Sequence, residues 1–287
     1  MAEREKKTLR AIQEKASRGE KLSMLALYDY PLALLAEESG VDLLLVGDSV
    51  AMNVYGGDDT LGADMEMLIR HTQAVRRGAP GTYLIGDMPY MSYQPSIETA
   101  IRNAGRFLAE GRADAIKIEG GRNVLDIIEA LVKAGVPVMS HLGYLPQSTP
   151  KIGRGIVQGR EAQTACELVE EAKQLERAGI AMLVLECVPP PVSEAIVARV
   201  GIPVIGIGSG PACHGQVLVV HDILGLYPRM TPKFVRKFAD LKDPITRAIG
   251  DYVQAVGAGT YPAPEQCYGM KPGESEAFHR LLEERKI

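Results

Sequence analysis

The stretch DLLLVGDS, residues 42–49, is an almost unbroken apolar run that ends abruptly in a carboxylate and a hydroxyl. A strand with one solvated face alternates apolar and polar residues, whereas a parallel strand covered on both faces is continuously rich in Val, Ile and Leu. This run therefore predicts a buried parallel strand. Comparable runs recur, and with this one the candidate strands are residues 23–28, 42–47, 82–86, 115–118, 137–140, 181–185, 203–207 and 216–220.

Helical segments lie between most of these runs, with apolar residues at three- and four-residue spacing and a glycine just after each. They span residues 30–39, 64–77, 96–110, 124–134, 160–178 and 192–200. This alternation predicts an eight-stranded parallel (β/α)8 barrel of the TIM type, because right-handed crossovers place the helices outside the sheet. A doubly wound open sheet is the competing fold. The connection GSGPACHG is too short for a crossover helix, so the barrel is irregular there or the strand count is wrong.

The C-terminal part, about residues 233–287, is expected to add helices outside the barrel. They are predicted over residues 233–240, 244–256 and 274–285, with a Pro/Gly-rich piece at 257–273. Since no low-complexity linker interrupts the chain, we expect residues 1–287 to form a single domain. The charged last helix is interpreted as a solvated face, with an oligomer contact as the alternative.

The composition excludes several classes of protein. The 287 residues are 46% hydrophobic and 24% charged, which is typical of a globular chain with a large core. A net charge of −4, no Trp and only four Phe argue against nucleic-acid binding. Five Gly and two Pro interrupt the most apolar stretch, residues 200–220, so it predicts strands and no membrane span. A charged N-terminus without a secretion signal and four dispersed cysteines predict a cytoplasmic protein.

Polar residues end the apolar runs, at the carboxyl ends of the strands where the chemistry of α/β barrels collects. Burying an unpaired charge costs several kcal/mol, so a metal ion or mutual pairing must compensate. We read a metal site as the simplest explanation. The strand-end residues are Asp48, Ser49, Asp87, Lys117, Glu119, His141, Glu186, His221 and Asp222.

Asp48 and Asp87 are the strongest candidate metal ligands. Each follows a glycine, which allows the backbone to approach closely at the rim. Ligation by oxygen alone favours a hard divalent ion, Mg²⁺ first. Glu119 is a candidate third ligand, through water, and a capping role remains the alternative for either aspartate.

The other strand-end residues suggest binding and proton transfer. Lys117 and Glu119 lie two apart on one strand and point the same way, which also fits a buried ion pair. His141 is interpreted equally well as a core histidine. Glu186 ends an otherwise apolar run, which suits a group that takes and returns a proton. The glycines of residues 206–210 lack the spacing of a dinucleotide fingerprint, and no nucleophile elbow or zinc-protease motif is present.

A longer series of motifs runs through the chain: VGDSVAM, HTQAVRRGAP, DMPYMSYQ, IKIEGG, GVPVMSHLG, PQS, VQGR, LVLECVP, IPVIGIGSG and HDILGL. In this order they resemble the ketopantoate hydroxymethyltransferase family, from about residue 5 to residue 262. The resemblance implies a barrel related to the phosphoenolpyruvate mutase and isocitrate lyase group. It also implies a homo-oligomer, a decamer in that family, and a role in making ketopantoate for pantothenate and coenzyme A synthesis.

The resemblance assigns roles to the strand-end residues. It implies that Asp48 and Asp87 ligate Mg²⁺ and that Glu119 is the third carboxylate of the metal site. The ion would chelate the carboxylate and keto oxygen of 3-methyl-2-oxobutanoate and stabilise charge on the enolate oxygen. The donor of the one-carbon unit is 5,10-methylenetetrahydrofolate in this family.

The remaining matched positions concern the 2-oxo acid. Ser49 and Lys117 match residues that bind it, and Lys117 would hold its carboxylate as a point charge. His141 matches a further site position. Glu186 matches the assigned proton acceptor. The resemblance therefore implies removal of the C3 proton, attack of the enolate on the one-carbon unit and hydrolysis of the adduct.

The sequence departs from the family pattern in its loops. Three of the changes are expected at the catalytic rim of the barrel: residues 51–57 and 144–156 differ in character, with a lysine and a tyrosine missing before VQG, and His214 replaces a carboxylate. These changes leave an alternative function open: a Mg²⁺-dependent aldolase or C–C lyase for a different 2-oxo acid or aldehyde acceptor. A non-enzymatic scaffold is disfavoured, because the candidate metal and base positions are all retained.

Overall fold

The computed structural model of the chain describes residues 6–149, 153, 156–226 and 231–286. The chain divides into two compact units, one ending at Ala239 and one beginning at Asp240. In the described part of the chain no helix is both long and apolar enough to cross a membrane.

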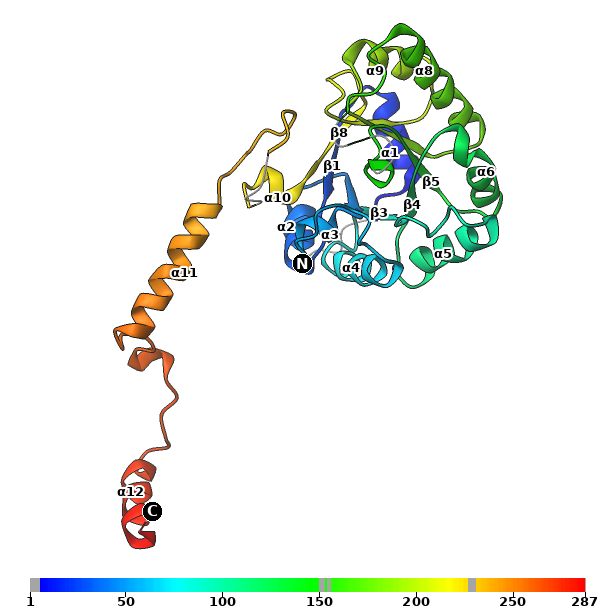
Figure 1. Cartoon of the computed structure of the whole chain (residues 1–287). Helices are drawn as coiled ribbons and strands as arrows, with labels where there is room; N and C mark the ends of the chain where they lie inside the picture. The colour runs from blue at the N-terminus through cyan, green and yellow to red at the C-terminus, as the bar shows by residue number, and fades with distance from the viewer. Residues whose placement is uncertain (1–5, 150–152, 154–155, 227–230, 287) are drawn as a thin grey trace. The chain divides into compact units, whose positions relative to one another are not determined.

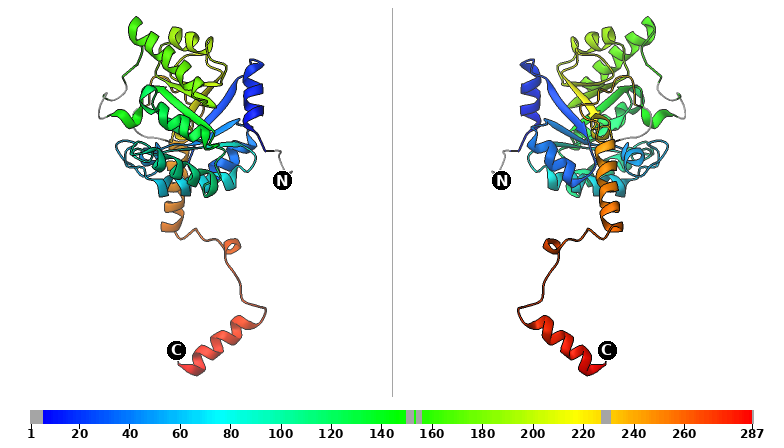
Figure 2. Two further views of the ribbon diagram at one scale, coloured as in Figure 1. Left: turned by 90° about the vertical axis from the view of Figure 1, so that its right-hand side faces the viewer. Right: turned by 90° about the vertical axis from the view of Figure 1, so that its left-hand side faces the viewer.

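Eight parallel strands close into a barrel in sequence order, with β1 paired to both β2 and β8. The predicted (β/α)8 barrel is thus confirmed, and an open sheet is excluded. Figures 1 and 2 show the helices arranged outside the strands. The strands are β1 (Leu22–Ala26), β2 (Leu43–Val46), β3 (Tyr83–Asp87), β4 (Ala115–Glu119), β5 (Val138–Gly143), β6 (Met182–Glu186), β7 (Val204–Ile207) and β8 (Gly215–Val219).

All six predicted crossover helices are confirmed. Several begin with a side-chain cap: the carboxylate of Asp29 accepts from the backbone N–H of Leu32 at 2.8 Å, and that of Asp64 accepts from Met67 at 2.8 Å. The crossover helices are α2 (Tyr30–Glu38), α4 (Met65–Gly78), α5 (Ile97–Ala109), α6 (Leu125–Lys133), α8 (Ala162–Arg177) and α9 (Pro190–Val197). Short elements are α3 (Val50–Asn53), η1 (Arg122–Val124), η2 (Pro146–Ser148) and α10 (Val220–Ile223).

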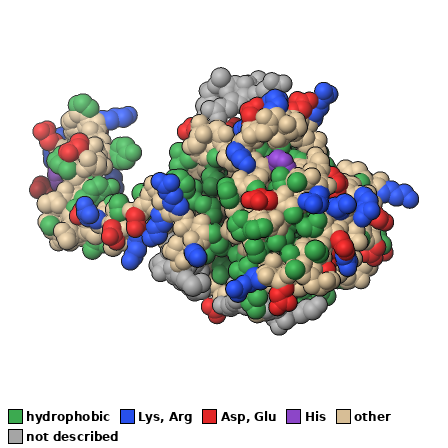
Figure 3. All heavy atoms as spheres, turned by 90° about the horizontal axis from the view of Figure 1, so that it is seen from above, with side chains coloured by type: hydrophobic (Ala, Val, Ile, Leu, Met, Phe, Trp, Pro, Cys, Tyr) green, Lys and Arg blue, Asp and Glu red, His purple; other side chains and the backbone are tan. Residues whose placement is uncertain are grey.

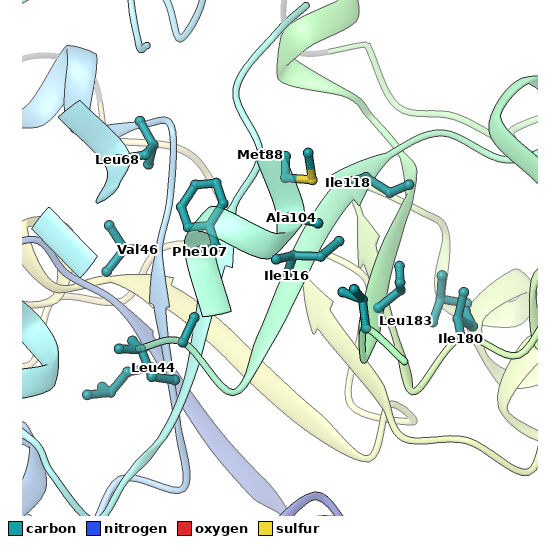
Figure 4. Close-up of a cluster of buried hydrophobic side chains, with 14 of the residues drawn as sticks. Leu44, Val46, Leu68, Met88, Ala104, Phe107, Ile116, Ile118, Ile180 and Leu183 are labelled. Carbon is teal, nitrogen blue, oxygen red and sulfur yellow. The ribbon is translucent and has the colours of Figure 1, made fainter. Parts of the chain in front are cut away.

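One hydrophobic core lies between the barrel and its helices (Figure 4). Leu44 of β2 and Ile116 of β4 face it, as does Phe107 of α5. Gly86 of β3 faces the same side, where any Cβ would collide with the ring of Phe107. Close packing therefore accounts for this glycine, and the expected backbone approach at the rim does not.

A second core fills the barrel interior at the amino ends of the strands. It joins inward-facing residues such as Met24, Leu43 and Met182 to Ile12 and Ala16 of α1 (Leu9–Ser17). Helix α1 begins at the N-cap Thr8, whose hydroxyl accepts from the N–H of Ala11 at 3.2 Å. The N-terminal helix therefore closes this end of the barrel, and polar chemistry is left to the other end.

The connection between β7 and β8 is irregular, as its length predicts. Residues 208–214 contain no helix, and only Ile205 and Gly206 of β7 pair with β8. The segment carries the chain from the carboxyl end of β7 to the amino end of β8. There the Nδ1 atom of His214 accepts from the N–H of Val204 at 3.0 Å, and its carbonyl accepts from Leu22 at 2.9 Å. The expectation that His214 alters the catalytic rim is therefore wrong.

The segment after α10 does not form the helix predicted over residues 233–240. The N–H groups of Phe238 and Ala239 instead donate to the carbonyl of Ile223, at 2.8 and 3.1 Å, and that of Val235 donates to Pro232 at 3.0 Å. These tertiary and turn hydrogen bonds use donors that a helix would need, so tertiary contacts override the local pattern.

The second unit contains the two other helices predicted for the C-terminal part. They are α11 (Lys242–Gly257) and α12 (Glu274–Arg285), with η3 (Pro264–Gln266) between them, and neither helix buries a residue. Ile249 and Val253 of α11 are 60% and 62% exposed. Hydrophobic side chains also gather on the face of the barrel unit seen in Figure 3. A single domain over residues 1–287 stays a prediction.

Candidate active site

The inward-facing positions of the strands change from apolar to polar as the strands end. Asp87 lies two residues beyond Ile85, which belongs to the inner core. Glu186 is likewise two residues beyond Val184. Because side chains alternate between the two faces of a strand, this step of two keeps them pointing into the barrel.

A cavity of about 400 Å³ opens at these strand ends. Its volume lies in the range of ligand pockets, roughly 300–1,000 Å³. The structure brings every predicted catalytic, substrate-binding and metal-binding residue to this one cavity. Those lining it are Asp48, Ser49, Asp87, Lys117, Glu119, His141 and Glu186, together with Asp222.

Asp87 is the most tightly held carboxylate of the cavity. Its side chain is 1% exposed; Oδ1 accepts from Lys117 Nζ at 2.7 Å, and Oδ2 accepts from the N–H of Asp48 at 3.1 Å. Burial raises the pKa of Asp87 to about 7 against the lowering effect of Lys117, and the charge of Asp48 raises it further. A second positive charge at this place would hold the carboxylate ionised.

Glu119 and Lys117 share the inner face of β4. Glu119 Oε1 lies 3.9 Å from Lys117 Nζ and has no hydrogen-bond partner among the described residues, although it is buried. Burial raises the pKa of Glu119 well above its ordinary value. Burial lowers the pKa of Lys117, but Asp87, Glu119 and Asp48 outweigh it and raise that pKa above its ordinary value. The lysine therefore stays protonated.

His141 stands between the carboxylate cluster and Glu186. Its Nδ1 lies 3.7 Å from Glu119 Oε1 and its Nε2 lies 3.3 Å from Glu186 Oε2, without hydrogen-bond geometry at either nitrogen. Burial lowers the pKa of His141, so the ring is neutral near pH 7. The Glu186 side chain is 16% exposed, which gives this carboxylate access to the cavity.

Ser49 is held by residues that the sequence did not single out. Its Oγ lies 2.8 Å from the hydroxyl of Tyr28, which also accepts from Asn53 Nδ2 at 3.2 Å. The ring of His221 stacks on Tyr28 at a centroid distance of 5.6 Å. Asp222, next in sequence, lines the cavity.

Gln147 and Tyr93 are the main buried polar residues that sequence reasoning missed. Gln147 is 3% exposed and Tyr93 is 1% exposed, and they are joined by a hydrogen bond of 2.9 Å. Tyr93 lies on the loop after β3 and Gln147 in the short η2 after β5, so no strand or long-helix periodicity marks them. Their motifs, DMPYMSYQ and PQS, were the available signal.

The two loops that depart from the family pattern do reach the cavity. Met52 and Asn53 line it from the loop after β2, and Tyr144 lines it from the loop after β5, with its hydroxyl 2.8 Å from Thr149 Oγ1. Residues 150–152 and 154–155 of the second loop lie outside the described residues.

Sequence comparison places the chain beside well-defined relatives. The ketopantoate hydroxymethyltransferase family model matches residues 6–264. A protein of Syntrophobacter fumaroxidans named 3-methyl-2-oxobutanoate hydroxymethyltransferase is 50% identical over 271 residues, which cover 94% of this chain and 96% of that protein. A protein of the same name from Enterococcus faecalis is 47% identical over 274 residues, covering 96% and 100%.

Solved structures share the fold at much lower identity. A phosphonopyruvate hydrolase in complex with oxalate and Mg²⁺ superposes with a TM-score of 0.60 at 14% identity and covers 97% of this chain and 99% of its own. A 2,3-dimethylmalate lyase of the PEP mutase/isocitrate lyase superfamily gives 0.54 at 15% identity, covering 97% and 96%. These two structures therefore share the predicted barrel fold with this chain.

Proposed function

The chain belongs to the ketopantoate hydroxymethyltransferase family, and on that premise we propose how its cavity adds a hydroxymethyl group to 3-methyl-2-oxobutanoate. The observation that carries the proposal is the convergence of the matched chemical residues on one cavity at the strand ends. The product of the reaction is ketopantoate, the 2-oxo acid from which pantothenate is made.

We propose that Asp48, Asp87 and Glu119 hold one divalent cation, Mg²⁺ first. No three His, Cys, Asp or Glu side chains already surround a common point as a metal site in the described ranges. The donor set nevertheless fits: three carboxylates share one ammonium, that of Lys117, so a divalent cation supplies the positive charge needed to ionise all three, and Glu119 Oε1 is buried without a hydrogen bond among the described residues. When bound, the cation supplies positive charge for the oxygen on which the enolate charge develops.

Lys117 and Ser49 are proposed to bind the 2-oxo acid. The ammonium of Lys117 is buried beside Asp87. Among the described residues that line the cavity, Lys117 is the only Lys or Arg. It supplies a fixed charge for the substrate carboxylate. The hydroxyl of Ser49, oriented by Tyr28, supplies a neutral hydrogen bond.

Glu186 is proposed as the base that removes the C3 proton. Its carboxylate faces the cavity and, among the residues that the structure describes, contacts His141 but no Lys or Arg side chain. A neutral His141 leaves the negative charge of Glu186 unpaired, which keeps that carboxylate available to accept a proton. His141 also separates Glu186 from the carboxylates proposed to hold the cation.

The one-carbon donor is proposed to be 5,10-methylenetetrahydrofolate. A small 2-oxo acid beside Lys117 fills only part of the cavity, and the remaining wall extends over apolar residues such as Ile207, Val219 and Phe234. We further propose a cytoplasmic homo-oligomer, a decamer as in the family, and the exposed apolar side chains of α11 support self-association.

A time course in D₂O followed by mass spectrometry tests this function. The reaction contains the protein, Mg²⁺, 3-methyl-2-oxobutanoate and methylenetetrahydrofolate, and both C3 deuteration and the hydroxymethyl product are measured. We expect deuteration without the folate and ketopantoate with it. Deuteration without product would favour an aldolase or lyase with another acceptor. The absence of both deuteration and product would contradict the proposed substrate. Omitting Mg²⁺ in the presence of EDTA is the matched control.

A further inference from the structure

Gln147 makes a set of hydrogen bonds that joins two carboxylates of the site. Its Nε2 donates to Asp48 Oδ2 at 3.0 Å and to the carbonyl of Met88 at 3.0 Å. Its backbone N–H donates to Glu119 Oε2 at 3.0 Å. One residue of η2 therefore contacts Asp48, which follows β2, and Glu119, which ends β4.

The orientation of the Gln147 amide is fixed by its partners. The carbonyl of Met88 can only accept, so the NH₂ group must face it and Asp48. The other end, Oε1, accepts from the Tyr93 hydroxyl at 2.9 Å. A tyrosine hydroxyl carries its proton at physiological pH and can therefore donate to this oxygen. The whole amide is thus satisfied, which favours one rotamer.

These contacts leave one oxygen of each carboxylate unused. Asp48 Oδ1 and Glu119 Oε1 have no hydrogen-bond partner among the described residues. Groups that hydrogen-bond to the far oxygen of a ligand orient it and tune its affinity for a metal. A side chain that occupied both oxygens would instead compete with the cation.

We propose that Gln147 is a positioning residue that turns Asp48 and Glu119 so that one oxygen of each is presented to the divalent cation. This inference rests on the proposed function, because it concerns the same site. It assigns to the loop after β5 a role in metal affinity that is separate from proton transfer.

Calorimetric titration of the substrate-free, full-length protein with Mg²⁺ alone tests the inference. Gln147→Met keeps the bulk and the backbone N–H to Glu119 but removes the donor to Asp48. We expect the dissociation constant to rise about 10- to 100-fold, the usual effect of losing such a partner. Saturating Mg²⁺ should restore kcat to within a few-fold of wild type. The Mn²⁺ EPR spectrum of the bound ion should also change.

Two further variants separate this role from a structural one. Tyr93→Phe leaves the Gln147 side chain in place but removes the Tyr93 donor to its Oε1, which then keeps only Gln94 Nε2 at 3.5 Å, and it removes the hydrogen bonds of Tyr93 to the Glu119 backbone. We expect a smaller rise in the same direction. Gln163→Met is the matched control, because Gln163 of α8 donates to Glu167 at 3.0 Å on the surface, and its Mg²⁺ affinity should equal that of wild type.

The outcomes distinguish this inference from the proposed function. Wild-type Mg²⁺ affinity in Gln147→Met, with or without a lower melting temperature, would overturn the positioning role alone. Should Gln147→Met fail to fold, unchanged affinity in Tyr93→Phe would do the same. A wild-type protein that binds no Mg²⁺ would overturn the metal site itself, and with it this inference.

Discussion

The two ends of the barrel interior are built on the same strands and the same inward-facing positions, yet they differ in chemistry. On β6, Met182 lies in the closed apolar core beneath the cavity, and Glu186 faces the cavity at the carboxyl end. The amino end gains stability from apolar burial, whereas the carboxyl end gathers charges whose desolvation opposes folding. The contrast teaches that changes at the two ends of one strand should separate stability from catalysis.

The largest expected effect is on catalysis, from Glu186→Gln. This change keeps the shape of a side chain whose carboxylate lies 3.3 Å from His141 Nε2, and it removes the ability to accept a proton. We expect C3 deuterium exchange to slow about 10³-fold, as for loss of a general base. The melting temperature should change little. Exchange is measured by mass spectrometry in D₂O.

The control for that change is Glu194→Gln on the exposed surface of α9, which should leave exchange and melting unaltered. Wild-type exchange in Glu186→Gln would assign the base to another group. A large fall in melting temperature would show that the two ends of β6 do not separate as argued.

The next effect is on stability, from Met182→Ala at the other end of the strand. Met182 is completely buried in the inner core, so its truncation leaves a cavity. We expect the free energy of unfolding to fall by about 3 kcal/mol, with kcat/KM per folded molecule unchanged. Urea denaturation measures the first quantity and steady-state kinetics the second.

Met182→Leu serves as the volume-conserving control and should cost less than about 1.5 kcal/mol. Loss of kcat/KM in the folded Met182→Ala protein would contradict the separation, because it would show that packing of the inner core governs the site above it.

The inner core and the strand-end site were predictable because both follow from strand periodicity. Apolar runs such as residues 42–47 identify buried parallel strands, and a step of two along a strand places Glu119 beside Lys117 on the same face. The barrel strands and the lining residues at their ends rest on that regularity, and the six crossover helices rest on the three- and four-residue spacing of their apolar residues.

Gln147, by contrast, acts from a loop after β5, and loop conformation depends on partners distant in sequence such as Met88. For the same reason the helix expected over residues 233–240 does not form. His214 was misplaced because a helix-free crossover takes the chain to the opposite end of the barrel within a few residues.

A smaller effect concerns pH and arises at the amino end, from His214. Burial lowers the pKa of His214, and its Nδ1 accepts a backbone hydrogen bond, so the folded protein favours the neutral ring. In the unfolded chain His214 has its ordinary pKa of about 6.5, so between that pH and the lower folded pKa the unfolded chain binds a proton that the folded protein does not. The stability contributed by this residue is present above that pH and is lost as the pH falls through the lower folded value.

His214→Asn isolates this contribution, because the Asn side-chain oxygen is an acceptor that does not titrate. We expect the free energy of unfolding of the wild type to fall relative to that of the variant as the pH is lowered from 7.5 to about 5.5. Urea denaturation across this interval provides the measurement. A difference that does not vary with pH would contradict a neutral, buried His214.

The smallest effect is expected at the rim, from Tyr144→Phe. The Tyr144 ring lines the cavity, and within the described part of the chain its hydroxyl hydrogen-bonds to Thr149 Oγ1 alone, so removing the oxygen loosens the loop without touching the carboxylates. One lost hydrogen bond corresponds to about 1 kcal/mol, or roughly a fivefold change. We expect that change in the KM of the folate donor, with the KM of the 2-oxo acid and kcat unaltered. A rise in the KM of the 2-oxo acid, with the KM of the folate donor unaltered, would contradict this prediction and place Tyr144 beside the 2-oxo acid.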